Sequence, residues 1–305
     1  MDTRQMQTLV AIDDTGSFAA AARIVNLTAS AISQQIQALE AELGASLFDR
    51  TKRPPQLNAK GDEVVRAARQ MLQIMVETRA AISGGRTGGV LGFGAIRTFS
   101  TRLVPEAFSR MRDAHPNLSF NLQVGMSETL MSHVASGRLD AAVVADNVGV
   151  SPGLVWTPIL SEPLMLVAPA ALAGATERQL FRRLPFIRYE TQVPLARQIE
   201  TELSDMGVPV REIAVANTMP SVVGCVIAGL GVAVVPKIAL LDAPAGGLYV
   251  QPFGGARITR RVGLVRRQIS SRSDVLDHMR DALRAQAENL GLDALPAEEA
   301  ATAPA

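Results

Sequence analysis

Residues 16–61 constrain the fold of this 305-residue chain more than any other segment. A helix predicted over about residues 4–14 ends at Gly16, because glycine readily adopts the positive φ that follows a helix. Ser17 and Thr28 are good N-caps for two further helices, and residues 26 and 27 form a turn between them. The segment therefore predicts three short helices joined by tight turns.

The third predicted helix begins after Thr28 and runs toward Glu42. Apolar residues recur along it at steps of about 3.6, as a buried face requires; they are Ala31, Ile32, Ile36, Leu39 and Leu43. In a helix-turn-helix protein the start of the second helix of the motif meets base edges, where glutamine pairs with adenine and serine with several bases. The candidate base-reading residues are Thr28, Ala29, Ser30, Ser33, Gln34 and Gln37.

A basic cluster follows these helices. Arg50, Lys52 and Arg53 precede a pair of prolines, and Lys60 comes after it. This arrangement predicts a β-hairpin wing whose cations contact DNA phosphates. Taken alone, a serine and glutamine face is more often an ordinary solvated helix surface, so the basic wing is what favours DNA reading.

These residues resemble the LysR-type transcriptional regulators. The family pattern is matched at Gly16, Ser17, Phe18, Ala21, Ala22, Thr28, Ser30, Ala31, Ile32, Ser33, Ile36, Leu39, Glu40, Leu43, Gly44, Leu47, Phe48, Arg50 and Gly61. Two positions depart from it. Ala29 stands where the family often has glutamine or proline, so one expected base contact is missing. Asn58 replaces the usual threonine before Gly61, which alters a helix cap.

Bulk charge does not predict DNA binding here. The formal net charge of the chain is +1, and residues 1–60 carry six basic and six acidic side chains, a net of zero. We therefore expect modest non-specific affinity, with specificity that depends on base contacts and dimer geometry. The single cysteine, Cys225, lies in an apolar run, which predicts a buried small residue rather than a redox sensor.

The N-terminus and the apolar runs predict a soluble cytoplasmic protein without membrane contact. Charged residues interrupt the N-terminus, so no signal peptide is visible. The longest apolar run, residues 222–235, contains three glycines. It is shorter than the roughly 18 to 20 residues that a membrane helix needs.

Residues 62–83 contain neither glycine nor proline, and their apolar side chains recur at steps of three and four. This predicts one amphipathic helix of roughly 33 Å. Such a helix either packs on its own domain or pairs with a second copy, and the family resemblance favours pairing. The glycine-rich residues 84–89 predict a flexible hinge.

From residue 90 onward, short apolar runs alternate with helical stretches. The predicted strands are residues 90–96, 119–124, 141–144, 165–168, 185–189 and 231–235; the predicted helices are residues 105–114, 128–136, 195–206 and 219–228. This alternation predicts an α/β fold with mainly parallel sheets.

The second half also resembles the effector domain of the same family, which is similar to periplasmic binding proteins. The landmarks are Leu-Val-Pro at 103–105, His-Pro at 115–116, Gly-Arg-Leu-Asp at 137–140, Glu-Pro-Leu at 162–164, and Ala-Gly-Leu-Gly at 228–231 with Val-Pro at 235–236. The resemblance covers roughly residues 2–290 and implies two subdomains, two crossing strands and a ligand cleft.

The expected organisation has four parts. They are a winged helix-turn-helix domain (1–60), a linker helix with its hinge (61–89), an effector domain (90–290) and a disordered tail (291–305). Subdomain I comprises residues 90–161 and 264–290, and subdomain II comprises residues 162–263. The resemblance also implies a homo-oligomer and contact with RNA polymerase. Dimer and tetramer both stay open, and the resemblance favours the tetramer.

Ligands of open α/β sheets bind beyond the carboxyl ends of strands, and helix N-termini favour anions. The candidate effector-binding residues are Thr98, Phe99, Ser100, Thr101, Met126, Ser127, Tyr189, Thr191 and Asn217. Each hydroxyl is equally explained as a cap of its own helix. A small organic acid is the hypothesis for the effector.

The competing function classes are an enzyme and a solute-binding protein on the same two-lobed fold. We found no HExxH, CxxC, GxSxG or phosphate-loop motif in the sequence. The three histidines lie far apart along the chain and show no metal-ligand spacing. Neither a cofactor nor a metal is therefore expected.

Overall fold

The computed structural model describes residues 1–82, 89–146, 149–189, 194–207, 210–244 and 246–295. Its N-terminal head contains α1 (Thr3–Thr15), α2 (Phe18–Ile24), α3 (Ala29–Leu43) and a hairpin of β1 (Phe48–Asp49) and β2 (Gln56–Leu57). The Ser17 and Thr28 side chains accept hydrogen bonds from backbone N–H groups in the first turns of α2 and α3, which confirms both predicted caps. Gly16 ends α1 with a φ of 64°.

The core of the head forms where the three helices meet. Ile32, Ile36 and Leu39 of α3 are buried there as predicted. Leu43 is 41% exposed, so its predicted burial is wrong. It is the last residue of α3, beyond the part of the helix that the small head covers.

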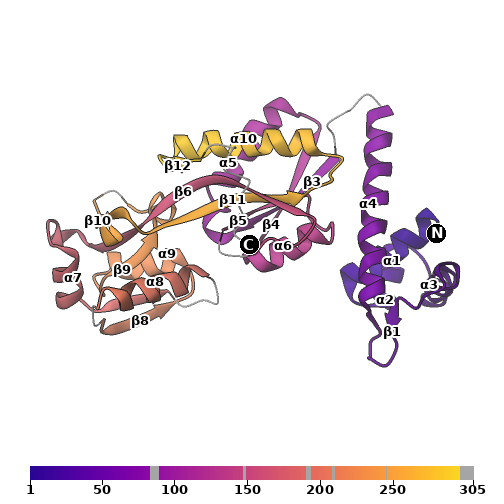
Figure 1. The fold of residues 1–305 in the computed structure, drawn as a ribbon, viewed down its shortest axis with the longest axis horizontal. Coiled ribbons are helices and arrows are strands. Elements are labelled where there is room, and N and C mark those ends of the chain that lie inside the picture. Colours follow the sequence, from indigo (N-terminus) through magenta and orange to yellow (C-terminus); the bar gives the residue numbers. More distant parts are fainter. Residues whose placement is uncertain (83–88, 147–148, 190–193, 208–209, 245, 296–305) are drawn as a thin grey trace.

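Helix α4 (Ala59–Ile82) leaves the head as a single long helix (Figure 1). It begins three residues before the predicted start at 62, because the Asn58 side chain accepts hydrogen bonds from the N–H groups of Lys60 and Gly61. Met71 and Ile74 are 44% and 53% exposed on its outer half. The predicted hinge lies outside the described residues, except for Gly89, which begins the next strand.

Lobe I follows α4 and is built around a hydrophobic core. It contains β3 (Gly89–Ile96), η1 (Arg97–Phe99), α5 (Leu103–Ala114), β4 (Leu118–Gly125), α6 (Ser127–Ala135), β5 (Ala141–Ala145) and α10 (Ser273–Asn289). Strand β3 pairs in parallel with both β4 and β5. The carboxyl ends of these strands therefore lie at one edge of lobe I.

Lobe II has its own core. It contains η2 (Ala170–Leu172), α7 (Glu177–Arg183), β7 (Phe186–Tyr189), α8 (Pro194–Asp205), β8 (Glu212–Ala216), α9 (Met219–Ile227), β9 (Ala233–Pro236), η3 (Lys237–Leu240), β10 (Leu248–Pro252) and η4 (Phe253–Ala256). Strands β7 and β8 are parallel. Cys225 is half-buried against this core.

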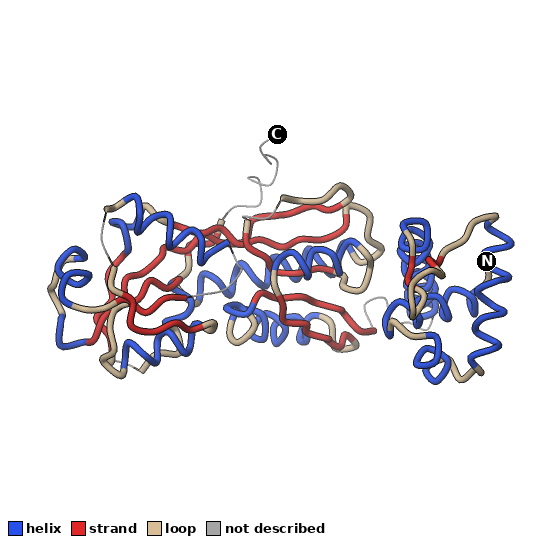
Figure 2. The backbone as a smooth tube through the Cα atoms, turned by 90° about the horizontal axis from the view of Figure 1, so that it is seen from below, coloured by secondary structure: helices blue, strands red, loops and turns tan. Residues whose placement is uncertain are grey.

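Two long strands, β6 (Leu154–Pro169) and β11 (Thr259–Arg267), cross from one lobe to the other (Figures 1 and 2). They pair antiparallel with each other, and β6 also pairs antiparallel with β9 and β10. The sheets are therefore mixed, and the prediction of mainly parallel sheets is wrong. Periodicity cannot show that one strand contributes to two lobes.

The predicted disorder of the tail is wrong for its first residues. Strand β12 (Asp293–Ala294) pairs with β6, and Leu292 is buried in the lobe I core. The apolar Leu292 and the backbone pairing to β6 together order this segment. Residues 296–305 lie outside the described part of the chain.

Candidate DNA-reading surface and effector site

The candidate base-reading residues occupy the start of α3 and its exposed face. Thr28, Ala29, Ser30, Gln34 and Gln37 are exposed, and Ser33 is half-buried. All three hydroxyls of this set have local partners. Thr28 caps the helix and lies 3.0 Å from the Ser30 hydroxyl, while Ser33 donates to the carbonyl of Ala29 at 3.0 Å. Because those hydroxyls make local bonds, Gln34 and Gln37 are the longest uncharged groups presented by this face.

The wing cations differ in their surroundings. Arg50 pairs with Glu40 at 2.7 Å, and the other oxygen of Glu40 accepts the N–H of Leu47 at 2.7 Å. Arg50 therefore braces the wing against α3, with its charge partly neutralised. Lys52 donates to the Gln56 side chain across the hairpin at 2.9 Å, and Arg53 is exposed at the tip. Lys52 and Arg53 are the better candidates for phosphate contact.

One carboxylate lies on the same wing. Hydrogen bonds from the side chain and the backbone N–H of Thr51 lower the pKa of Asp49. The wing therefore keeps a negative charge near its cations at neutral pH. This agrees with a head whose electrostatic attraction to DNA is modest.

The predicted effector residues of lobe I lie at one edge of its sheet. Ile96 at the end of β3 is paired with Gly125 at the end of β4, so η1 and the start of α6 are neighbours. Thr98 and Ser100 are half-buried there, and Thr101 and Met126 are exposed. Ser127 is nearly buried and accepts the N–H of Ala145 at 3.3 Å.

Phe99 corrects the prediction for this turn. Its side chain is fully buried in the lobe I core. It therefore supports the turn from beneath and does not face the edge of the sheet. An aromatic residue among hydroxyls is ambiguous in sequence, because the direction of its side chain depends on the 3-10 turn that follows β3.

The lobe II candidates lie at the corresponding edge of their own sheet. Tyr189 ends β7 and is paired with Ala216, the residue before Asn217. Thr191 lies outside the described residues. Arg97 of lobe I donates from Nη1 to the carbonyl oxygen of Asn217 at 3.1 Å, so the two edges face each other.

A buried ion pair beneath this region has no counterpart in the sequence prediction. Arg260 of β11 donates to Glu162 of β6 from Nε at 2.8 Å and to the Thr98 hydroxyl at 3.0 Å. Glu162 also accepts the N–H of Ile238 at 2.9 Å. A charged residue inside each crossing strand is the only signal in the sequence that points to this pair.

The structure brings two of the three histidines together. His115 Nε2 lies 2.9 Å from His278 Nδ1, and burial lowers the pKa of His115. Within the described residues, no three His, Cys, Asp or Glu side chains lie together so that they could hold a metal ion. The pair links α5 to α10.

Two family models match the chain. The LysR substrate binding domain matches residues 84–288, and the bacterial regulatory helix-turn-helix protein of the lysR family matches residues 3–62. The chain belongs to the LysR family of transcriptional regulators. A probable RuBisCO transcriptional regulator of Guillardia theta is 29% identical to this LysR-family chain over 273 residues, covering 86% of the chain and 88% of the relative.

Solved structures share the fold of this LysR-family regulator. A full-length OxyR variant from Pseudomonas aeruginosa superposes with a TM-score of 0.74 at 22% identity, covering 93% of this chain and 95% of that one. Full-length CbnR in complex with its target DNA superposes with a TM-score of 0.60 at 20% identity, covering 94% and 100%. The chain is thus a DNA-binding transcriptional regulator with an effector-binding domain, and it is not an enzyme.

Within the described part of this LysR-family chain, no helix combines the length and hydropathy that a membrane crossing requires.

Proposed function

We propose that this LysR-family regulator controls transcription in response to a small organic anion bound between its lobes. The hydrogen bond from Arg97 to the Asn217 carbonyl supports this best, since it directs a cation across the space between two strand edges. The hydroxyls of Thr98, Ser100 and Tyr189 lie at the same two edges. A carboxylate accepts a charge-assisted hydrogen bond from arginine better than a carbonyl does.

The proposed mechanism is an exchange of partners at Arg97. An anion that binds Arg97 replaces the Asn217 carbonyl and makes its own contacts with both edges. It therefore changes the free energy of one lobe arrangement relative to another and shifts their populations. The crossing strands β6 and β11 join the lobes, so the change reaches lobe I and the linker.

The proposed organisation keeps three of the four parts expected from the sequence. A winged helix-turn-helix head (1–60), a linker helix (61–89) and an effector domain (90–290) act in a cytoplasmic homo-oligomer, a dimer or tetramer. The exposed Met71 and Ile74 of α4 support pairing of two linker helices. Contact with RNA polymerase is part of the same proposal.

A gel-shift assay on the DNA upstream of the protein's own gene tests the DNA-binding part. We expect retention that is sequence-specific and weakens with salt, against a scrambled fragment of equal length. Retention that is equal for both fragments would contradict sequence-specific regulation at this locus.

Thermal unfolding with sodium salts of small carboxylates, at ionic strength matched with NaCl, tests the effector part. A bound carboxylate stabilises the protein by mass action. Arg97→Gln should abolish the stabilisation, while Arg112→Gln on α5 should not. Equal stabilisation of both variants would exclude Arg97 as the anion ligand.

A further inference from the structure

Four charged side chains join the DNA-reading head to lobe I. Asp13 and Asp14 lie in the last turn of α1, Arg69 lies midway along α4, and Arg138 lies between α6 and β5. Arg69 donates to Asp13 at 2.8 Å and also pairs with Asp14. Arg138 pairs with the same carboxylate oxygen of Asp13 and lies 3.4 Å from its carbonyl oxygen. One aspartate of the head is thus shared by the linker helix and lobe I.

The centre of the cluster is sheltered from solvent, while Asp14 at its edge is 46% exposed. The side chains of Arg69 and Asp13 are 10% and 16% exposed, and that of Arg138 is 34% exposed. Burial raises the pKa of Asp13, but hydrogen bonds from Arg138 and Arg69 outweigh it and leave that pKa below its ordinary value. The carboxylate is therefore ionised at neutral pH, and both arginines hold it.

The loop that carries Arg138 is itself held in place. Gly137 has a φ of +77°, and a Cβ there would lie 3.3 Å from the Cβ of Arg69, so its backbone packs on the stem of that arginine. Arg267 donates to the carbonyls of Val134 and Leu139 at 2.8 and 2.9 Å. Lobe I thus presents Arg138 to the head from a fixed position.

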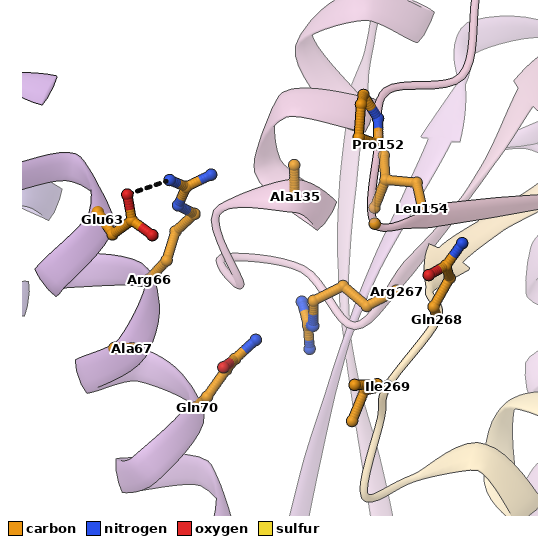
Figure 3. A pocket seen from close by; sticks show the side chains of 11 residues that line it. Glu63, Arg66, Ala67, Gln70, Ala135, Pro152, Leu154, Arg267, Gln268 and Ile269 are labelled. Carbon is orange, nitrogen blue, oxygen red and sulfur yellow. Dashed lines mark ion pairs between the residues drawn. The ribbon is translucent and has the colours of Figure 1, made fainter.

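Beside this cluster, α4 and lobe I separate. A cleft of about 350 Å³ lies between Glu63, Arg66 and Gln70 of α4 on one side and Arg267, Gln268 and Ile269 on the other (Figure 3). Arg66 pairs with Glu63 of its own helix at 3.8 Å rather than with lobe I (Figure 3). Polar and apolar side chains both line this cleft, so α4 and lobe I are not closely packed there. The ion pairs between Asp13 and Arg138 join the two parts beside the opening.

We propose that Asp13, Asp14, Arg69 and Arg138 form an ionic latch that holds the DNA-reading head in one orientation against lobe I. A small number of charge-assisted bonds over an open seam forms a contact with two states, closed and open. Opening the latch frees the head and α4 to turn relative to the effector domain. The latch therefore sets the relative placement of the DNA-reading surfaces in an oligomer. The proposal of a latch does not depend on whether an anion binds between the lobes.

His133 provides a direct test of the latch in the full-length protein. It lies on α6, with Nδ1 3.1 Å from the Gln123 side chain. Burial lowers the pKa of His133, the charges of Arg138 and Arg69 lower it further, and Asp13 raises it. A residue of the head therefore acts on a histidine of lobe I, and only while the latch is closed.

The first experiment titrates the three histidines by NMR on histidine-labelled full-length protein. Asp13→Asn should lower the pKa of His133, and Arg138→Gln should raise it. Asp62→Asn, the same charge change at an exposed site on α4, is the matched control. If Asp13→Asn moves the pKa of His133 no more than Asp62→Asn does, the latch is not closed in solution and the proposal fails.

The second experiment measures the affinity for the DNA fragment retained in the gel-shift assay. Asp13→Asn adds positive charge and Arg138→Gln removes it, so bulk electrostatics would move the affinity in opposite directions. The latch predicts that both variants change the DNA affinity in the same direction. It also predicts that the affinity of the double variant differs from that of wild type by no more than that of either single variant. Opposite or additive effects would overturn the proposal. The histidine titration stands even if no DNA is bound.

Discussion

Removing Arg260 should destabilise the effector domain by breaking the buried ion pair between the crossing strands. Arg260 is 5% exposed and Glu162 is 0% exposed. In Arg260→Met, the carboxylate of Glu162 stays buried and keeps the hydrogen bond from the N–H of Ile238, but it loses its cationic partner. An uncompensated buried charge of this kind costs about 3–5 kcal/mol.

Two smaller losses accompany the same change. The Thr98 hydroxyl loses its bond from Arg260, worth about 1 kcal/mol net. The guanidinium lies 5.2 Å from the centre of the Phe99 ring, a contact worth about 1 kcal/mol. The methionine side chain restores part of the apolar contact with Phe99. The total loss of unfolding free energy should therefore be about 4–5 kcal/mol, the upper part of the 3–5 kcal/mol range for the unpaired charge.

The double variant Glu162→Gln/Arg260→Met separates these effects. Glutamine has no charge and can still accept the N–H of Ile238, so the double variant should recover at least half of the lost stability. Urea unfolding followed by Trp156 fluorescence measures the free energy. Trp156, the single tryptophan, lies on β6 with Gly263 of β11 packed against its ring. A loss below about 1 kcal/mol for Arg260→Met would refute the argument from an unpaired buried charge. A double variant no more stable than the single one would refute it as well.

Three further outcomes follow from the head. Lys52→Ala should weaken binding to every DNA sequence and reduce the salt slope by about one, whereas Gln34→Ala should cost about 1–3 kcal/mol of binding free energy on the specific site alone. Anisotropy titrations at several salt concentrations distinguish the two variants. If Gln34→Ala weakens binding equally on all fragments, base reading by Gln34 is excluded. Gly61→Ala should lower the Tm of the head, because the added Cβ would lie 2.3 Å from the Leu47 carbonyl, and an unchanged Tm would contradict that contact. The pKa of Asp13 in the folded protein lies below its ordinary 3.8, so the ionised carboxylate stabilises the fold fully above that pH and loses this effect as pH falls through the folded pKa. The difference in unfolding free energy between wild type and Asp13→Asn should therefore shrink below about pH 3.8. A difference that stays constant with pH would refute this coupling between protonation of Asp13 and stability.

The head was largely predictable because its signals are local. Ser17, Thr28 and Gly16 act on backbone groups within a few residues, and the spacing of Ile32, Ile36 and Leu39 defines one helix face. Where burial depends on what covers a side chain, sequence reasoning failed. Leu43 fits the apolar period but lies beyond the cover of the head.

In the effector domain, the sequence predicted the strand ends that face each other but missed their cations. Thr98, Tyr189 and Asn217 follow apolar strands, and strand order places such residues at sheet edges. The roles of Arg97 and Arg260 depend on which segments of the other lobe arrive opposite them. Arg97 meets a residue 120 positions away, and Arg260 meets one 98 positions away.

The sequence by itself determined the helix-turn-helix head, its caps, the exposed polar face of α3 and the alternation of strands and helices. These depend on short-range backbone geometry and on periodicity, which neighbouring residues encode. Only the tertiary structure decided that β6 and β11 cross the lobes with a buried ion pair and that Asp13 meets Arg138 across 125 residues. Such pairings depend on the topology of the whole chain, because the residues next to an arginine in sequence do not indicate which carboxylate it will contact.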